Sequence, residues 1–246
     1  MEPTEPSGTD GTAATAPDPD FRRSLPVRWS RSQKYWAGRY DKRGHVGAVC
    51  GETANDLRYW RNAVSVWELV KPVITDMLRV WPSPRDEHFF NRVLDLGCGS
   101  GRFIPFLLSI ANEYVGADRA DQAIKVADTR FGCPETTFFQ AVISDLPREL
   151  GKFDLIWSCA AMQHVVDPAD FERACDHLAD HVHGDGAFLL LHENSNPAQL
   201  GRNHCQPRSP HLYMDMLKKT GWAEFLVRSG VRDGDDAYSI IAAVFR

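Results

Sequence analysis

The chain has 246 residues, 43% of them hydrophobic and 25% charged, with a formal net charge of −5 at pH 7. This is the composition of a globular protein, and the length suffices for the core of one domain with an extension. No basic excess marks a binding face for duplex nucleic acid, and no apolar run approaches the roughly 20 residues that span a bilayer. We therefore expect neither a nucleic-acid nor a membrane partner.

The first segment is poor in large apolar side chains. Up to about Asp20 it consists mainly of Pro, Thr, Ala, Gly and acidic residues. It cannot bury enough surface to offset the entropy of ordering, so residues 1–22 are predicted to be a disordered tail. The segment lacks the charged-then-apolar layout of a signal peptide, and the six cysteines form no Cys-x-x-Cys pair. Both features favour a cytoplasmic protein with reduced thiols.

A basic and aromatic stretch follows at residues 27–43. Trp36 and Tyr40 lie one helical turn apart, so their rings can share one face of a helix. Interleaved arginine and aromatic side chains also suit single-stranded nucleic acid, and a structural helix that docks its aromatics on a core is another reading. From 55 to 80 the apolar residues recur at helix spacing, interrupted by Pro72, which predicts a kink or two abutting helices.

The most informative motif runs from Val93 to Phe103. An apolar run that contains Asp95 leads into three alternating glycines, Gly97, Gly99 and Gly101. This pattern predicts a strand, a tight turn and the start of a helix, where the backbone can approach a ligand closely. A dinucleotide fingerprint needs a third glycine where this chain has Arg102, which disfavours a nicotinamide oxidoreductase.

Strands and helices alternate after this motif. Helices are predicted near residues 103–110, 120–130, 168–183 and 209–220, and strands near 114–118, 137–143, 153–159, 188–193, 222–227 and 238–245. Such alternation predicts an α/β fold, a parallel sheet with helices on both faces.

The pattern Asp-x-Gly-x-Gly-x-Gly at 95–101, with the downstream strands in order, resembles the class I S-adenosylmethionine (SAM) methyltransferases, in their small-molecule branch. The resemblance extends from about Leu57 to the C-terminus. It implies a Rossmann-like, seven-stranded, mostly parallel sheet whose last strand is antiparallel. Residues 23–85 would form an N-terminal helical lid and the first core helix, and residues 86–246 the SAM-binding core.

The resemblance also implies how SAM is held. Asp118, at the end of the second strand, would bind the ribose hydroxyls, and Asp95 would attract the ammonium group. Many members carry an acid for adenine where this chain has Val142, so backbone groups and apolar packing would take its place. The implied cofactor-binding residues are Trp36, Asp95, Gly97, Gly99, Gly101, Asp118, Val142, Ile143 and Cys159.

Three residues near strand ends are candidates for catalysis. His164 follows the fourth strand and titrates near neutral pH, which suits a base; a local bond at a helix start is the alternative. His192 and Glu193 end the fifth strand, where either could touch the methyl acceptor, and Glu193 would suit an amine. A late-helix histidine group around His181 fits a solvated helix end, so no metal is predicted.

The predicted function is SAM-dependent methyl transfer to an oxygen or nitrogen of a polar small molecule, in the manner of a bacterial secondary-metabolite tailoring enzyme. The polar segment 194–213 would help to wall the acceptor pocket. The alternatives are a protein or peptide N-methyltransferase and a SAM-binding protein without transfer. The acceptor itself and the oligomeric state stay open at this stage.

Overall fold

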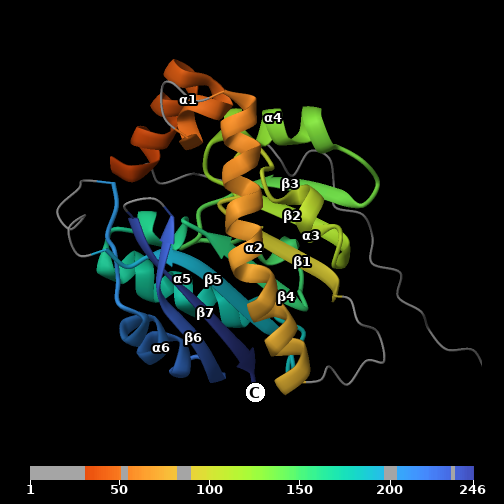
Figure 1. Ribbon diagram of the computed structural model, residues 1–246, viewed down its shortest axis with the longest axis vertical. Coiled ribbons are helices and arrows are strands. Elements are labelled where there is room, and N and C mark those ends of the chain that lie inside the picture. The colour runs from red at the N-terminus through yellow and green to blue at the C-terminus, as the bar shows by residue number, and fades with distance from the viewer. Residues whose placement is uncertain (1–30, 51–54, 82–89, 197–203, 234–235) are drawn as a thin grey trace, which may run out of the picture.

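The computed structural model describes residues 31–50, 55–81, 90–196, 204–233 and 236–246 (Figure 1). The predicted disordered tail, residues 1–22, lies outside these ranges, and the domain boundaries stay predictions. The helices are α1 (Arg31–Cys50), α2 (Asp56–Val80), α3 (Ile104–Leu107), α4 (Asp121–Phe131), α5 (Pro168–Asp180) and α6 (Pro210–Lys218). The strands are β1 (Phe90–Leu96), β2 (Ala111–Asp118), β3 (Thr136–Gln140), β4 (Leu155–Cys159), β5 (Phe188–Asn194), β6 (Trp222–Asp233) and β7 (Asp236–Phe245).

The seven strands form one sheet in the order β3-β2-β1-β4-β5-β7-β6. Strands β1 to β5 pair in parallel, and β7 runs antiparallel to both β5 and β6. The predicted Rossmann-like sheet with an antiparallel last strand is therefore confirmed. The order of the strands reverses between β1 and β4. Ligands of open α/β sheets bind at such a point, outside the carboxyl ends of the strands.

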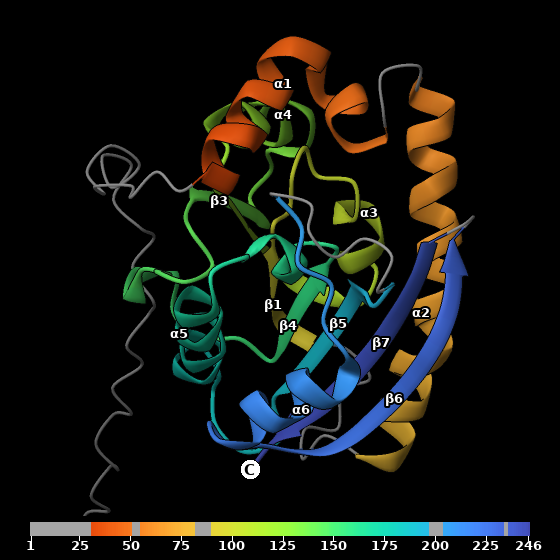
Figure 2. The ribbon, with the colours of Figure 1, turned by 90° about the vertical axis from the view of Figure 1, so that its left-hand side faces the viewer.

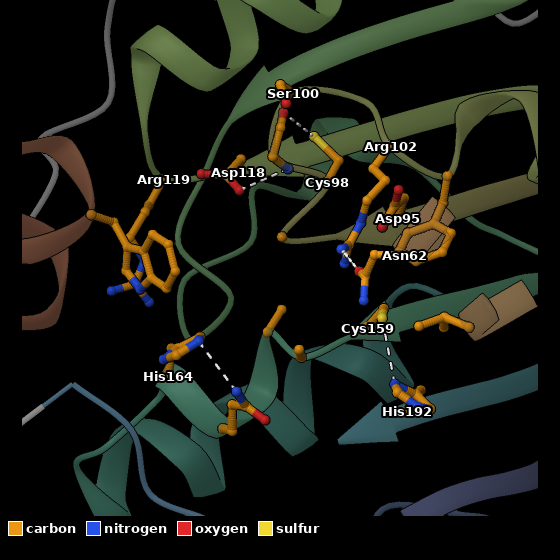
Figure 3. Close-up of a pocket in the computed structure, with 18 of the residues that line it drawn as sticks. Asn62, Asp95, Cys98, Ser100, Arg102, Asp118, Arg119, Cys159, His164 and His192 are labelled. Carbon is orange, nitrogen blue, oxygen red and sulfur yellow. Dashed lines mark hydrogen bonds between the residues drawn. The ribbon is translucent and has the colours of Figure 1, made fainter. Parts of the chain in front are cut away.

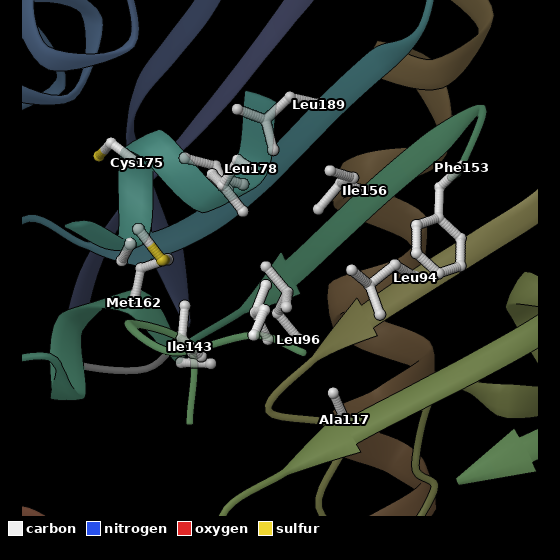
Figure 4. Close-up of a cluster of buried hydrophobic side chains, with 14 of the residues drawn as sticks. Leu94, Leu96, Ala117, Ile143, Phe153, Ile156, Met162, Cys175, Leu178 and Leu189 are labelled. Atoms are coloured by element: carbon white, nitrogen blue, oxygen red, sulfur yellow. The ribbon is translucent and has the colours of Figure 1, made fainter. Parts of the chain in front are cut away.

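Helices cover both faces of the sheet, and α5 and α6 lie on the face opposite α2 (Figure 2). Successive side chains of a strand point to opposite faces, so neighbouring residues enter different cores. Leu94 and Ile156 belong to the core that includes residues of α5 and α6 (Figure 4). Val93 and Leu155 belong to the core on the other face, with residues of α2 and α3. This arrangement fixes β1 and β4 at the centre of the molecule.

Helix α2 begins at a side-chain cap and passes through Pro72 without ending. The Asn55 side chain accepts a hydrogen bond from the backbone N–H of Arg58, and the helix then continues to Val80. A proline removes one backbone donor, but the buried face of α2, from Tyr59 to Met77, holds it against the sheet. The alternative of two abutting helices was therefore wrong.

Two other helices differ from the predicted pattern. The predicted helix at 103–110 is reduced to α3, a single turn. Helix α1 contains a break at Gly44, whose φ is 64° and ψ 179°, so it consists of two helical pieces. No helix in the part of the chain that the structure describes is long and apolar enough to cross a membrane.

The central packing yields a prediction. Ile156→Ala is expected to lower the free energy of unfolding by about 2–5 kcal/mol, because Ile156 is fully buried and the change leaves a cavity. Leu57→Ala is the control, since the Leu57 side chain is 68% exposed and its loss should stay within about 0.5 kcal/mol. Urea unfolding of both variants measures the difference, and equal losses would contradict this account of the core.

Candidate active site

A cavity of about 360 Å³ opens at the carboxyl ends of β1, β2, β4 and β5, beside α1 and α2 (Figure 3). Most of the predicted site residues meet there. Those that line the cavity are Trp36, Asp95, Gly97, Gly99, Asp118, Ile143, Cys159, His164 and His192. Three predicted residues, Gly101, Val142 and Glu193, lie outside its lining. Nine of the twelve predicted residues therefore surround one cavity, and their roles there stay predictions.

The glycine turn is held tightly against β2. Gly97 donates from its backbone N–H to the Ala117 carbonyl at 2.7 Å, and Gly99 donates to Oδ2 of Asp118 at 3.0 Å. Gly97 and Gly99 have φ values of 70° and 56°. A Cβ on Gly97 would overlap that of Ala161, and one on Gly99 would lie 2.9 Å from the Tyr40 hydroxyl. The turn therefore requires glycine at both positions.

Gly101 has a different role from the one predicted. A Cβ there would meet the side chains of Ile104 and Phe131 at 2.6 Å and 2.7 Å. Its φ is 85°, a conformation that side-chain-bearing residues rarely adopt. Gly101 therefore lets the turn pack against its neighbouring helices rather than approach a ligand.

Two carboxyl groups, those of Asp95 and Asp118, line the cavity. Burial raises the pKa of Asp95 to about 7; a 2.7 Å hydrogen bond from the Tyr114 hydroxyl opposes this shift, and the Asp118 charge adds to it. Burial also raises the pKa of Asp118, while hydrogen bonds from the backbone N–H groups of Ala120 and Gly99 lower it. These acids give the cavity a region that favours a cationic or hydroxyl-bearing ligand.

His164 lies on the turn after β4, between α1 and the segment that begins at His204. Its Nδ1 is 2.5 Å from the His204 carbonyl oxygen, and the Trp36 ring meets it edge-on at 4.8 Å between centroids. Burial lowers the pKa of His164 to about 4, helped by the positive charges of Arg119 and Arg39. His164 is therefore an uncharged imidazole at neutral pH.

Glu193 holds the turn after β4 in place through hydrogen bonds. The Glu193 side chain is 1% exposed, and its carboxylate accepts hydrogen bonds from the Ser158 hydroxyl and from the backbone N–H groups of residues 161–163, at 2.7–3.2 Å. Arg208 donates to the carbonyls of Met162 and Val165 at 3.4 Å and 2.6 Å. The predicted contact between Glu193 and an acceptor has no support in this geometry.

His192 occupies the opposite side of the cavity from the glycine turn. It pairs in register with Cys159, and the two side chains meet at 3.5 Å between Nδ1 and Sγ. The Tyr238 ring stacks on the imidazole at 4.7 Å and 13°. The side chains of His192, Cys159 and Tyr238 together form a polar and aromatic wall of the cavity.

Several lining residues were not predicted as site residues: Asn62, Arg102, Arg119, Gln163 and Tyr238. Arg102, which follows the glycine turn, donates a hydrogen bond to the side-chain oxygen of Asn62 on α2. Arg119 and Gln163 follow Asp118 and precede His164 in the sequence, so their positions beside predicted residues were an available signal. Val142 lies outside the lining, whereas its neighbours Ala141 and Ile143 belong to it. Arg202 and Asn203 of the predicted acceptor wall fall outside the described residues.

Comparison with known families identifies the central segment. Residues 93–186, which contain the end of β1, the glycine turn and strands β2 to β4, match a methyltransferase domain. The expected relationship to the class I SAM-dependent methyltransferases is confirmed, and this segment is a methyltransferase domain.

Sequence relatives carry the same assignment. The chain is 27% identical over 161 residues to a ubiquinone biosynthesis O-methyltransferase of Xanthomonas axonopodis, covering 61% of this chain and 66% of that protein. It is 32% identical over 108 residues to an uncharacterized methyltransferase of Synechocystis, covering 43% and 50%. The chain thus spans less than two thirds of the length of these curated relatives.

Solved structures share the fold. Magnesium protoporphyrin IX methyltransferase from Synechocystis, determined with bound SAM, has a TM-score of 0.63 at 16% identity and covers 89% of this chain and 100% of its own. The N-methyltransferase NodS from Bradyrhizobium japonicum, in complex with S-adenosylhomocysteine, has a TM-score of 0.57 at 16% identity, covering 76% and 98%. At this identity the likeness establishes the fold.

The glycine turn yields a prediction with a matched control. Gly97→Ala should lower stability more than Gly230→Ala does, because both have positive φ, 70° and 72°, but only Gly97 faces a crowded space. The control carries backbone strain alone, about 1–2 kcal/mol. Denaturant unfolding of both variants measures the excess, and equal losses would contradict the close contact between Gly97 and Ala161.

Proposed function

We propose that this protein transfers a methyl group from SAM to an oxygen or nitrogen nucleophile of a polar small molecule. The observation that carries the proposal is the meeting of the glycine turn, two buried acids and an uncharged histidine in one cavity. The methyltransferase domain at residues 93–186 supports it.

The residues present fit SAM. Asp118 sits where a carboxylate can accept ribose hydroxyls, and Asp95 is a buried acid whose carboxylate form a nearby ammonium group would stabilise. Ala141 and Ile143 would pack against adenine, with Trp36 covering the site from α1. When bound, SAM would supply a methyl group on a positively charged sulfur. That sulfur is a good leaving group and needs no acid to protonate it.

The protein's own contribution is orientation, exclusion of water and removal of a proton. His164 can take that proton because burial keeps it uncharged at neutral pH. Helix α1 places Trp36 against His164, which closes the cavity on that side. His192, with Cys159 and Tyr238, would form the acceptor wall opposite the glycine turn.

The acceptor class rests on the cavity and on relatives. Asn62, Gln163 and His192 offer hydrogen bonds to a polar ligand of small size. The Xanthomonas relative is named as an O-methyltransferase and NodS as an N-methyltransferase, so both nucleophiles stay within the proposal. A role in secondary metabolism and a cytoplasmic location belong to the same proposal.

The direct test is turnover of SAM to S-adenosylhomocysteine in the presence of a bacterial metabolite extract. Mass spectrometry should find a product heavier by one methylene unit, carrying label from methyl-labelled SAM. A labelled protein or peptide product would instead favour the alternative transferase. SAM binding with no labelled product from extract or peptides would favour a binding protein without transfer.

SAM affinity is expected to depend on pH through Asp95. Its pKa of about 7 means that the carboxylate form, which attracts the ammonium group, is lost as pH falls through 7. Affinity should therefore weaken below pH 7, approaching about tenfold per pH unit, and binding should take place with release of a proton. Calorimetry in buffers of different ionisation enthalpy measures the release. Asp95→Asn should bind weakly with a flat profile between pH 5 and 8; an unchanged slope would contradict the role of Asp95.

His164→Ala is expected to lower the turnover rate by about 10²–10⁴-fold, while SAM affinity stays within a few fold. The wild-type rate should rise with pH through about 4, the pKa of His164, and this limb should vanish in the variant. His183→Ala, at an exposed position, is the control. A His164→Ala rate within about threefold of wild type, with the same pH profile, would retire His164 as the base.

A further inference from the structure

The side-chain amide of Gln163 has its orientation set by the backbone. Its Oε1 lies 2.8 Å from the backbone N–H of Asn194, which can only donate, so the oxygen of the amide must face it. The Nε2 end is thereby turned to His164, 3.4 Å from the imidazole Nε2. An amide nitrogen carries two hydrogens and accepts none. Gln163 therefore presents a hydrogen to His164.

The imidazole of His164 is constrained from its other side. Its Nδ1 lies 2.5 Å from the carbonyl oxygen of His204, which can only accept. Nδ1 must then carry the hydrogen, and Nε2 of the neutral ring keeps its lone pair. Protonating Nε2 would set two donors against each other, N–H of the ring and NH₂ of Gln163. The Asn194 N–H acts through Gln163 and the His204 carbonyl acts directly, and together they fix one tautomer of His164.

We infer that Gln163 is a positioning residue that holds His164 in its neutral form, with the Nε2 lone pair available to an acceptor proton in the cavity. The inference rests on the proposed methyl transfer for its catalytic meaning. Both side chains line the cavity. The long 3.4 Å contact is one that an acceptor hydroxyl can replace with a shorter bond.

Gln163 is itself held at both backbone groups. Its N–H donates to Oε2 of Glu193 at 3.1 Å, and its carbonyl accepts from the N–H of Gln206 at 2.8 Å. Together with the contact to Asn194, these bonds come from β5 and from the segment after residue 203. The residue beside the base is therefore tied to two separate parts of the chain.

The other groups around His164 act in the same direction. Arg119, Arg39 and the His204 ring lie close enough to oppose a positive charge on the imidazole, and the Trp36 edge contributes an apolar contact. Burial is the largest influence, and the His204 carbonyl opposes it by favouring the charged ring. Gln163 adds a directional bond, which decides the nitrogen that carries the lone pair.

The first test reads the tautomer in the wild-type protein. Imidazole ¹⁵N resonances of the full chain, with His164→Asn to assign the signal, should show Nδ1 protonated and Nε2 unprotonated at pH 7. A protonated Nε2, in either the other tautomer or the imidazolium, would overturn the inference. The measurement needs neither SAM nor an acceptor.

The second test changes the group that faces Nε2. Gln163→Glu keeps an oxygen for Asn194 but places a carboxylate oxygen near His164, so the pKa of His164 should rise by about 1–3 units in an NMR titration. Gln122→Glu on α4 is the matched control and should leave that pKa unchanged. Equal shifts in both variants, or none in Gln163→Glu, would overturn the inference.

The two proposals fail in different ways. If Gln163→Glu does not fold, the wild-type tautomer alone decides the inference. If wild-type protein binds no SAM in calorimetry, the proposed function fails while the NMR result on Gln163 still stands or falls by itself. A correct tautomer in a protein that binds SAM supports both.

Discussion

The buried carboxylate of Glu193 is the constraint on which the candidate site depends. A desolvated charge is costly unless several hydrogen bonds satisfy it, and here three consecutive backbone N–H groups and one hydroxyl do so. These hydrogen bonds hold the turn 161–163 in one conformation. Ala161 then closes against Gly97, and His164 emerges on the cavity side. Removing this acid would release both sides of the cavity at once, which explains its burial in β5 better than a contact with substrate does.

Asp118, at the end of β2, plays a similar part for the glycine turn. Its two oxygens accept from the backbone N–H groups of Gly99 and Ala120, so it ties the glycine turn to the start of α4. Glu193 and Asp118 therefore each fix a loop at the carboxyl edge of the sheet, the turn 161–163 and the glycine turn respectively. The difference lies in exposure to the cavity: Asp118 lines it and Glu193 does not. An acid at a strand end is thus ambiguous from sequence, because ligand binding and loop fixation use the same geometry.

Local pattern predicted the sheet, the glycine turn and the cavity, because apolar runs, glycines and acids at strand ends lie next to one another in the chain. The helix at 103–110 was overestimated, since apolar content says nothing of where tertiary packing ends a helix. Tyr238 comes from a distant segment, β7, so no local signal placed it in the cavity. The choice between His192 and Glu193 needed only the strand register: neighbours on β5 point to opposite faces, and His192 takes the cavity side.

Burial acts on the acids and the base of this cavity in opposite senses, and the result favours a cationic ligand. It raises the pKa of Asp95 to about 7 and lowers that of His164 to about 4, so both groups tend toward the uncharged form near neutral pH. A ligand that brings a positive charge next to Asp95 restores the carboxylate, whereas burial and the positive charges of Arg119 and Arg39 keep His164 neutral. The cavity thus has its negative charge beside the glycine turn and an uncharged imidazole on the other side, which is the arrangement that the proposed methyl transfer would use.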